Sequence, residues 1–282
     1  MGLYVNCLQL AYSRSGIGGG GFMVVRLPPL APNSTSEVWN VDFRETAPIL
    51  ANATMYEKHP MKARFSGLAV AVPGEARGLA EAHMRWGKLP WRRLVQPSAD
   101  LAAGWAVSKE LGHRVNVSIC NQRNYIEPNL ARKLPECRQF ILQHPVWRHM
   151  FAPDGVILRE GDAIRNTNLS RTLGLIAERG ADVFYQGEIA DAIISKIRAE
   201  GGIMTHEDLI NYKVNVSRAL EGTYRGLKVY TSHAPTSGPV LLHMLNLLEN
   251  YDLPAEGRTE VNVHRLVEAM KCKSTGSSFC AS

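Results

Sequence analysis

Arg44 is the residue whose type and setting most clearly suggest chemistry. It lies in the stretch VDFRETAP, Val41 to Pro48, at the end of an expected strand and on the same strand face as Asp42. A guanidinium offers a fixed fork of donors that matches a carboxylate with two parallel hydrogen bonds. The same two residues could instead form a surface Asp–Arg pair of little energetic value. Spacing alone leaves open whether Arg44 binds a ligand carboxylate.

The glycine-rich stretch SGIGGGGF raises a second candidate, a nucleotide site. Gly16, Gly18 and Gly21 match the Gly-x-Gly-x-x-Gly pattern of dinucleotide-binding loops. That pattern belongs between a strand and a helix, whereas here it leads into the apolar run FMVVRL, an expected strand. We expect instead a backbone that passes close to another segment or to a ligand, which glycine permits because it lacks Cβ.

Thr205 and His206 are neighbours that could be taken for a nucleophile and its base. Asp208 follows Thr205 by three residues, which is the spacing of a capping residue at a helix start. Adjacent residues on a helix do not face each other, so the hydroxyl and the imidazole would diverge. The pattern therefore predicts a helix cap.

The sequence predicts neither a metal site nor a serine-nucleophile turn. No His-Glu-x-x-His, His-x-His or paired-cysteine spacing occurs among the nine histidines and five cysteines. His83 and His243 lie in apolar helical stretches and are expected to be structural. Ser237 in TSGPV is expected to be the N-cap of the apolar helix that follows.

Bulk composition limits the class of protein. The 282 residues are 45% hydrophobic, enough for one large or two small cores. The net charge is +6, but the basic residues are scattered, so nucleic acid is not an expected partner. No apolar run approaches the roughly 18 residues of a membrane span, and Met1 does not begin a signal peptide.

Glycosylation sequons point to the secretory pathway. Asn-x-Ser/Thr occurs at Asn33, Asn52, Asn116, Asn168 and Asn215, more often than chance predicts. We therefore expect a glycoprotein of the cell surface or extracellular space whose leader or anchor segment is missing from this sequence. Cys120 and Cys137 could close one disulfide loop.

Periodicity predicts a mixed fold with strands at both ends and helices between them. Two antiparallel strands are expected at 22–27 and 37–44, with Trp39, Val41 and Phe43 on the buried face. A hairpin is expected at 220–232, turning at Arg225–Gly226. Helices are expected within 73–87, 92–108, 167–180, 187–202 and 238–253.

The C-terminal region changes character after Lys271. Val263, Leu266, Val267 and Met270 lie on one face of an expected helix, whereas the following stretch CKSTGSSFCAS is small and polar. We expect residues 1–271 to form one incomplete region and residues 272–282 to be an atypical tail of the kind that a gene-model artefact produces. Both ends of the sequence are expected to be truncated.

Several ordered motifs resemble the large chain of γ-glutamyltransferases, also called glutathione hydrolases. The resemblance covers Ser15 to Lys271. The motifs are SGIGGGGFMVV, VDFRETAP, AVPGEARGLAEAH, WGKLPWRRLVQPSADLAAGWAV, ERGADVFYQGEIADAI, GGIMTHEDLINY and TYRGLKVYTSHAPTSGPVLL. The family implies a layered α/β fold of the N-terminal nucleophile hydrolase type, with four layers in the order αββα, of which this sequence would supply only the large-chain part.

The resemblance also implies a role for Arg44. In this family the arginine of the DFRE motif binds the α-carboxylate of the γ-glutamyl group, and Arg44 occupies that position. We expect Asp42 and Glu45 to orient it, an inference from proximity rather than from the family. The implied substrates are glutathione and other γ-glutamyl compounds, with water, an amino acid or a peptide as acceptor. No cofactor is expected.

The family's nucleophile is not found in this sequence. It is a threonine, freed at the start of the small chain of the same precursor and followed by Thr or Ala and then His, a triplet absent here. We therefore expect the 282 residues alone to be inactive. Two alternatives remain: a non-catalytic truncated product such as a pseudoenzyme or binding partner, and an amidohydrolase or acylase of the same fold with another substrate.

Overall fold

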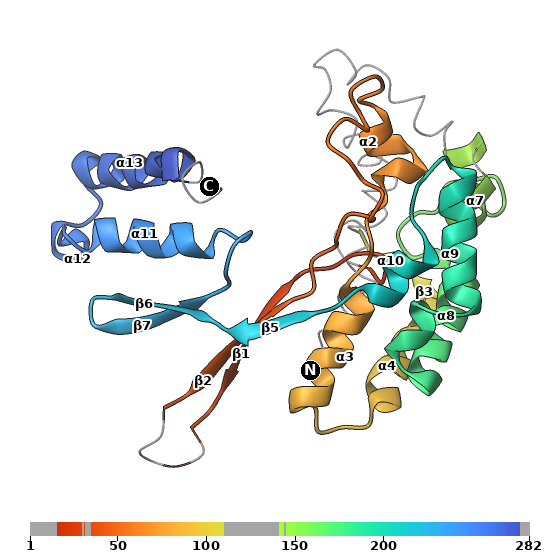
Figure 1. The fold of residues 1–282 in the computed structure, drawn as a ribbon, viewed down its shortest axis with the longest axis horizontal. Helices are drawn as coiled ribbons and strands as arrows, with labels where there is room; N and C mark the ends of the chain where they lie inside the picture. The colour runs from red at the N-terminus through yellow and green to blue at the C-terminus, as the bar shows by residue number, and fades with distance from the viewer. Residues whose placement is uncertain (1–15, 30, 32–34, 110–140, 144, 277–282) are drawn as a thin grey trace. The chain divides into compact units, whose positions relative to one another are not determined.

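The computed structural model describes residues 16–29, 31, 35–109, 141–143 and 145–276. The chain divides into two compact units (Figure 1). The first unit takes in the described residues of 1–20 and 45–212, and the second those of 21–44 and 213–282. The division at residues 271 and 272 stays a prediction, although helix α13 (Glu260–Gly276) runs through that boundary.

The first unit is mainly helical. Its longer helices are α3 (Glu75–Trp86), α4 (Trp91–Ala102), α8 (Thr167–Arg179) and α9 (Glu188–Ala199). Shorter elements are α2 (Lys62–Phe65), η1 (Gly67–Ala69), α7 (Pro145–Phe151), η3 (Ala181–Phe184), α10 (His206–Asn211) and the two-stranded sheet of β3 (Trp105–Ala106) and β4 (Ala163–Ile164). The predicted helices within 73–87, 167–180 and 187–202 are confirmed.

Local capping chemistry sets several helix ends. The Asn166 side chain accepts a hydrogen bond from the Leu169 amide at the start of α8, and Gly180, with φ of 88°, ends that helix. Thr205 and Asp208 form a reciprocal capping box at the start of α10. The predicted cap at Thr205 is confirmed, and His206 instead contacts Asp191 at 2.8 Å.

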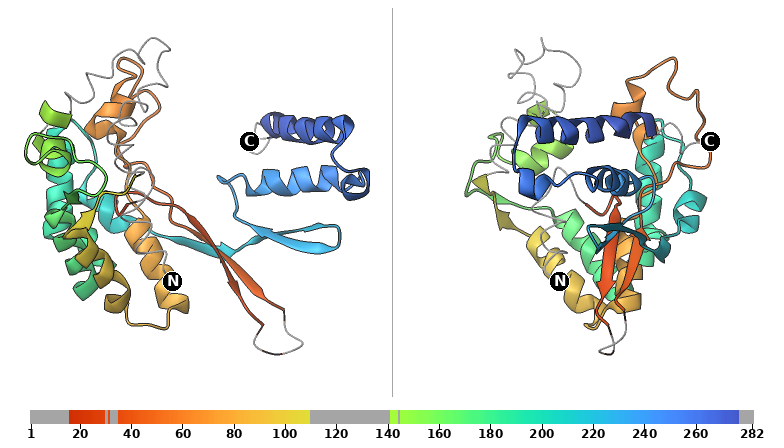
Figure 2. Two further views of the ribbon diagram at one scale, coloured as in Figure 1. Left: turned by 180° about the vertical axis from the view of Figure 1, so that it is seen from behind. Right: turned by 90° about the vertical axis from the view of Figure 1, so that its left-hand side faces the viewer.

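Small residues let the first unit's helices pack closely. Helices α4 and α8 lie side by side (Figures 1 and 2), and Ala99, Ala102 and Leu173 are buried between them. Gly67 and Gly202 make another close approach, because a Cβ on Gly67 would lie 2.2 Å from the Ile197 carbonyl oxygen. No side chain could occupy that space.

Arg77 of α3 links three distant parts of the first unit. Its Nε donates to Asp182 at 3.1 Å, and its Nη1 donates to the carbonyls of Leu209, Ile210 and Tyr212 at 3.0, 3.0 and 2.6 Å. The guanidinium carbon lies 4.1 Å from the ring centroid of Tyr185. Arg77 therefore supplies donors and positive charge at the C-terminal end of α10, where carbonyls lack helical partners.

Tyr185 is the buried aromatic partner of that arginine. Its hydroxyl donates to the Pro73 carbonyl at 3.0 Å and accepts from the Arg77 amide at 3.2 Å. The side chain is 1% exposed, and its burial raises the pKa of the phenol to about 12. Tyr212 stacks on it with ring centroids 6.1 Å apart.

The second unit contains a three-stranded antiparallel sheet in the order β1–β2–β5, formed by β1 (Phe22–Leu27), β2 (Glu37–Asp42) and β5 (Asn215–Arg218). The register places Val41 opposite Met23 on one side and Val216 on the other. The predicted antiparallel pairing of the first two strands is confirmed.

A hairpin and two helices complete the core of the second unit. Strands β6 (Leu220–Tyr224) and β7 (Leu227–Thr231) turn at Arg225 and Gly226, whose φ values of 50° and 76° fit a type I′ turn. Helix α11 (Gly238–Leu248) lies between this hairpin and α13 (Figures 1 and 2), with α12 (Leu253–Glu256) in the connection. The predicted turn and apolar helix are confirmed.

Two sequence expectations about side chains hold only in part. Val41 and Phe43 of the expected buried face are buried, but Trp39 is partly exposed, and Val38 and Asn40 of the opposite face are buried as well. Ser237 is the N-cap residue of α11, as expected, but its side chain makes no capping hydrogen bond, and Thr236 Oγ1 accepts the Gly238 amide instead. Helix α3 buries Glu75, Ala76 and Gly78 near its start, while Met84 near its end is 71% exposed.

Replacing Arg77 with leucine should destabilise the first unit. The Asp182 partner is 76% exposed, but the carbonyls of Leu209 and Tyr212 would lose their charged donor in a site where the Arg77 side chain is only 16% exposed, so we expect a cost of about 1.5 to 3 kcal/mol. Urea unfolding followed by circular dichroism measures it. The control is Arg171→Leu, which removes an exposed ion pair with Glu188 and should cost under about 1 kcal/mol. Equal effects would contradict the linking role.

Tyr185 should make stability fall at alkaline pH. The phenol's pKa is about 12 in the folded chain against a reference value of 10.0, so the unfolded state ionises first. The contribution of Tyr185 to the free energy of unfolding is fully present below pH 10. It is lost as the pH rises toward about 12, by about 3 kcal/mol in total. Unfolding free energies across this range should fall more steeply for the native chain than for Tyr185→Phe. Parallel curves would contradict this.

Candidate functional site

Backbone hydrogen bonds hold Arg44 from the N-terminal side, within the second unit. Phe43 and Gly21 exchange two hydrogen bonds, at 2.9 and 3.2 Å, which extend the β1–β2 ladder. The Arg44 amide then donates to Asp42 Oδ1 at 3.0 Å. The Asp42 side chain therefore holds the backbone of Arg44, as an aspartate in an Asx turn does. The Arg44 side chain is exposed, which suits a residue that binds a ligand.

Gly21 is required for this pairing. A Cβ built on it would lie 3.2 Å from Cε2 of the buried Phe43 ring. The ring is 5% exposed and has little room to move. The expectation that the glycine-rich stretch allows a close backbone approach is confirmed at this residue.

The residues that follow Arg44 are held within the first unit. Thr46 and Val72 exchange hydrogen bonds at 3.2 and 2.8 Å, and the Ile49 amide donates to Asp208 Oδ1 at 2.7 Å. The other oxygen of Asp208 accepts from the Thr205 amide and hydroxyl at 2.8 and 2.9 Å. One carboxylate thus caps α10 and holds Ile49, the residue that directly follows the VDFRETAP stretch.

Glu45 is half-buried beside the glycine-rich stretch of the first unit. Its Oε1 would lie 3.7 Å from a Cβ built on Gly19. The structure brings Asp42 to the Arg44 backbone, and Glu45 follows Arg44 along the chain in the other unit. The assignment of Asp42 and Glu45 as orienting residues stays a prediction.

Gly19 lies against the start of α3, within the first unit. Its carbonyl accepts the amides of Gly74 and Glu75 at 2.8 and 2.9 Å. Free amides at a helix start are what allow phosphate to bind there, and two of them are already bonded here. The glycines lead into β1 rather than into a helix. At this glycine-rich stretch a pyrophosphate would therefore meet neither these two helix-start amides nor a helix that follows the glycines.

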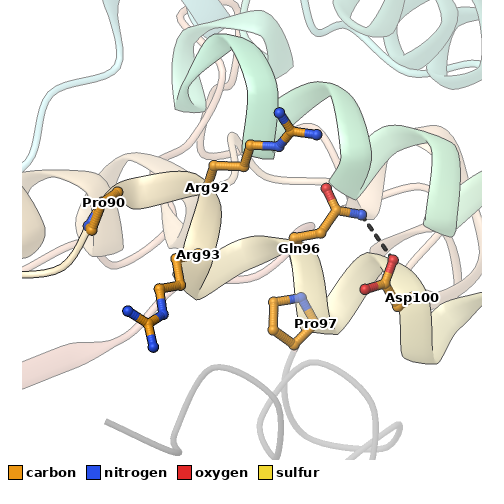
Figure 3. Close-up of a pocket in the computed structure, with 6 residues that line it drawn as sticks. All are labelled: Pro90, Arg92, Arg93, Gln96, Pro97 and Asp100. Atoms are coloured by element: carbon orange, nitrogen blue, oxygen red, sulfur yellow. Dashed lines mark hydrogen bonds between the residues drawn. The ribbon is translucent and has the colours of Figure 1, made fainter.

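A surface hollow of about 480 Å³ lies along α4, in the first unit (Figure 3). Figure 3 shows Arg92 and Arg93 directed to different sides of the helix, while Gln96 Nε2 donates to Asp100 Oδ1 at 2.8 Å. Two guanidinium groups that diverge cannot clamp one anion. We assign no ligand to this hollow, which also belongs to the unit that does not contain Arg44.

Charged and aromatic side chains cover part of the sheet that carries Arg44. Arg218 donates to Glu37 at 3.1 Å and stacks over Trp39 with its Cζ 4.1 Å from the ring centroid. The hydrogen bonds from Arg218 and then Trp39 lower the pKa of the Glu37 carboxyl. Arg218 thus makes an ion pair and a cation–π contact on the surface of this sheet.

Neither a metal site nor a membrane-spanning helix is found among the described residues. No group of three or more His, Cys, Asp or Glu side chains in that part of the chain could hold a metal ion. Nor does any helix there combine the length and apolar character needed to cross a membrane. His83 contacts the Leu89 carbonyl at 2.7 Å and the Trp91 ring at 5.3 Å, so its predicted structural role is confirmed.

Comparison with known families identifies the chain's relatives. The family model described as gamma-glutamyltranspeptidase matches residues 4–278. The chain belongs to the γ-glutamyltranspeptidase family. It is 37% identical over 264 residues to Glutathione hydrolase proenzyme 2 of Schizosaccharomyces pombe, covering 93% of this chain and 39% of that protein. The chain thus spans about two fifths of the length of such relatives.

Solved structures show the same fold. The Helicobacter pylori gamma-glutamyltranspeptidase matches with a TM-score of 0.81 and 30% identity, covering 98% of this chain and 74% of that one. Cephalosporin acylase from Bacillus halodurans matches with a TM-score of 0.72 at 24% identity, covering 96% and 47%, and shows the fold alone. The predicted mixed α/β fold of the N-terminal nucleophile hydrolase type is confirmed.

The structure describes three of the five sequons. Asn52, Asn168 and Asn215 are exposed, while Asn33 and Asn116 lie outside the described residues. Asn215 lies on β5 directly opposite Asp42. The proposed Cys120–Cys137 pair also lies outside them, so no disulfide is tested.

Sequence reasoning missed the residues that support the Arg44 stretch. The sequence pattern identifies Asp208 only as a cap, and it does not identify Val72 and Gly21 as partners of Thr46 and Phe43. The partners lie far along the chain, as with Ile49 and Asp208, 159 residues apart. A glycine or a short acidic side chain carries no local signal of such a contact.

Removing the Asp42 carboxyl should loosen the Arg44 backbone. Asp42→Ala deletes the acceptor of the Arg44 amide, a hydrogen bond of about 1 kcal/mol, so exchange of that amide with deuterium should quicken about fivefold. Asp42→Asn keeps an oxygen acceptor and should exchange nearly as the native chain does. The Thr46 amide, bonded to Val72, is the internal control. Unchanged Arg44 exchange in Asp42→Ala would show that this bond contributes nothing.

Proposed function

We propose that this chain is the large-chain part of an enzyme that cleaves the γ-glutamyl amide bond of glutathione and related compounds. The γ-glutamyl group passes to water or to an amino acid or peptide acceptor. The support is membership of the γ-glutamyltranspeptidase family together with the placement of Arg44. Relatives in the family carry the name glutathione hydrolase.

Arg44 is the observation that carries the proposal. Its amide is bonded to Asp42, its preceding residue pairs with Gly21, and its side chain is exposed. A guanidinium can meet a carboxylate with two parallel hydrogen bonds, and a fixed backbone removes one part of the entropic cost of binding. The γ-glutamyl group carries such a carboxylate at its α-carbon. Arg44 therefore selects substrates that carry this carboxylate and anchors the end of the γ-glutamyl group opposite the γ-carbonyl.

The chemical step requires a group that this sequence does not contain. A threonine hydroxyl at the start of the small chain attacks the γ-carbonyl, the C–N bond breaks, and the amine leaves with a proton. The α-amine of that threonine is the proposed base, and backbone amides of a glycine pair stabilise the oxyanion. Water or an acceptor amine then releases the γ-glutamyl group. We propose that the 282 residues alone bind but do not turn over substrate, so the small chain is the required partner.

We also propose a secretory-pathway location, at the cell surface or outside the cell. The support is the excess of sequons together with the exposure of Asn52, Asn168 and Asn215. Buried sequons would have argued against glycans, which are bulky and need solvent. Fluorescence of the tagged protein in its own cells, with and without peptide-N-glycosidase treatment of extracts, tests this.

Substituting Arg44 should raise KM. The test uses the complete reading frame, obtained by sequencing the transcript past the codon for Lys271, with release of p-nitroaniline from γ-glutamyl-p-nitroanilide as the assay. Arg44→Gln should lower kcat/KM by about 100-fold or more, because it leaves the carboxylate without its charged partner. Arg44→Lys, which keeps the charge but not the fork, should lose about tenfold.

The matched control is Arg26→Gln. Arg26 is another strand arginine of the same unit, and it donates to Ser36 at 2.9 Å. Its replacement should leave KM unchanged. Equal KM values for the Arg44→Gln and Arg26→Gln enzymes would remove Arg44 from the substrate site. A transcript that ends at Ser282 would favour the non-catalytic alternative for this product.

A further inference from the structure

Asn52 differs from the other described sequons in its local geometry. Its Oδ1 accepts two hydrogen bonds from Thr54, one from the amide at 3.1 Å and one from the hydroxyl at 3.0 Å. This is an Asx turn that brings the two defining residues of the sequon together. Nδ2, the atom to which a glycan is attached, makes no hydrogen bond to any described residue.

Exposed apolar side chains precede Asn52 directly. Ile49 is 75% exposed and Leu50 is 58% exposed. The backbone that carries them cannot turn inward, because the Ile49 amide is bonded to Asp208 and the Ala51 amide to the Pro48 carbonyl. Tyr56, whose hydroxyl donates to the Leu68 carbonyl at 2.6 Å, holds the far side of the loop. A fixed loop with adjacent apolar side chains in water favours association unless something covers it.

We propose that Asn52 carries an N-linked oligosaccharide that covers Ile49 and Leu50. The proposal rests on the proposed secretory-pathway location. In the transfer, Asn52 Nδ2 forms a bond to C1 of the first sugar of a polyprenyl-pyrophosphate-linked oligosaccharide. The C1–oxygen bond to the pyrophosphate breaks, Nδ2 loses a proton, and the lipid pyrophosphate leaves. The product is a bulky hydrophilic group two residues from Leu50, where it can lie over both side chains.

The other described sequons do not combine these features. Asn168 and Ser170 lie two positions apart in the first turn of α8, so their side chains point away from each other. Asn215 is opposite Asp42 on the sheet that leads to Arg44, where a glycan would crowd the proposed substrate site. Neither residue is preceded by two largely exposed apolar side chains. Asn168 is therefore a suitable control, since it is exposed but has no apolar pair to cover.

Peptide mapping tests the modification. The full chain is fused to a cleavable secretion leader and produced in yeast, so that entry into the pathway is imposed and does not depend on the native location. Secreted and retained protein are treated with peptide-N-glycosidase in ¹⁸O water, which converts a glycosylated asparagine to labelled aspartate. We expect label at Asn52. A chain with no label at Asn52, whether or not Asn168 is labelled, overturns the proposal, whereas failure of the native location alone would be seen only in cells.

Dye binding tests the covering role. Asn52→Asp cannot be glycosylated but keeps an oxygen acceptor for Thr54, and enzymatic removal of the glycan from folded protein produces the same residue. Both samples should bind several-fold more of the apolar dye ANS than glycosylated protein does. Ile49→Ser with Leu50→Ser in the Asn52→Asp background should remove the excess, and Asn168→Asp should change nothing. Equal ANS binding with and without the Asn52 glycan would overturn the covering role.

Discussion

The backbone of the VDFRETAP stretch is held by partners that are distant in sequence, and the proposed activity depends on that restraint. Phe43 pairs with Gly21, Thr46 pairs with Val72, and the Ile49 amide is bonded to Asp208. Arg44 follows the first of these pairings, and its own amide is held by Asp42. A long arginine side chain binds a carboxylate with high selectivity only if its starting point is fixed. The surrounding glycines and the capping aspartate make sense as parts of this restraint.

The helical unit gains its order from a second arginine used in a different way. Arg77 binds partners within the unit: Asp182, the carbonyls at the end of α10 and the face of the Tyr185 ring. Asp208 lies in that same α10 helix and bonds Ile49. The ordering of α10 by Arg77 and the anchoring of Ile49 are therefore linked through one short helix. Such a helix of six residues would not be stable alone, so the contacts from Arg77 and Ile49 contribute to its stability.

Sequence patterns predicted the parts of the fold that local chemistry determines. The ends of α8, the capping box at Thr205 and the turn at Arg225–Gly226 follow from neighbouring residues. The helix faces of α3 and the burial of Asn40 could not be predicted, because they depend on which distant segment packs there. Arg44 could be singled out by type and by resemblance. The partners of the neighbouring backbone could not, since Gly21, Val72 and Asp208 acquire these contacts only when the chain folds.

The central claim is that Arg44 binds the substrate α-carboxylate, and a cycle of enzyme and substrate changes tests it most directly. The complete enzyme and its Arg44→Gln variant are each assayed with γ-glutamyl-p-nitroanilide and with 4-aminobutanoyl-p-nitroanilide, which lacks only the α-carboxylate. If Arg44 binds that group, its loss should lower kcat/KM about 100-fold or more in the native enzyme and very little in the variant. The same loss in both enzymes would contradict the claim, because the carboxylate would then be recognised elsewhere.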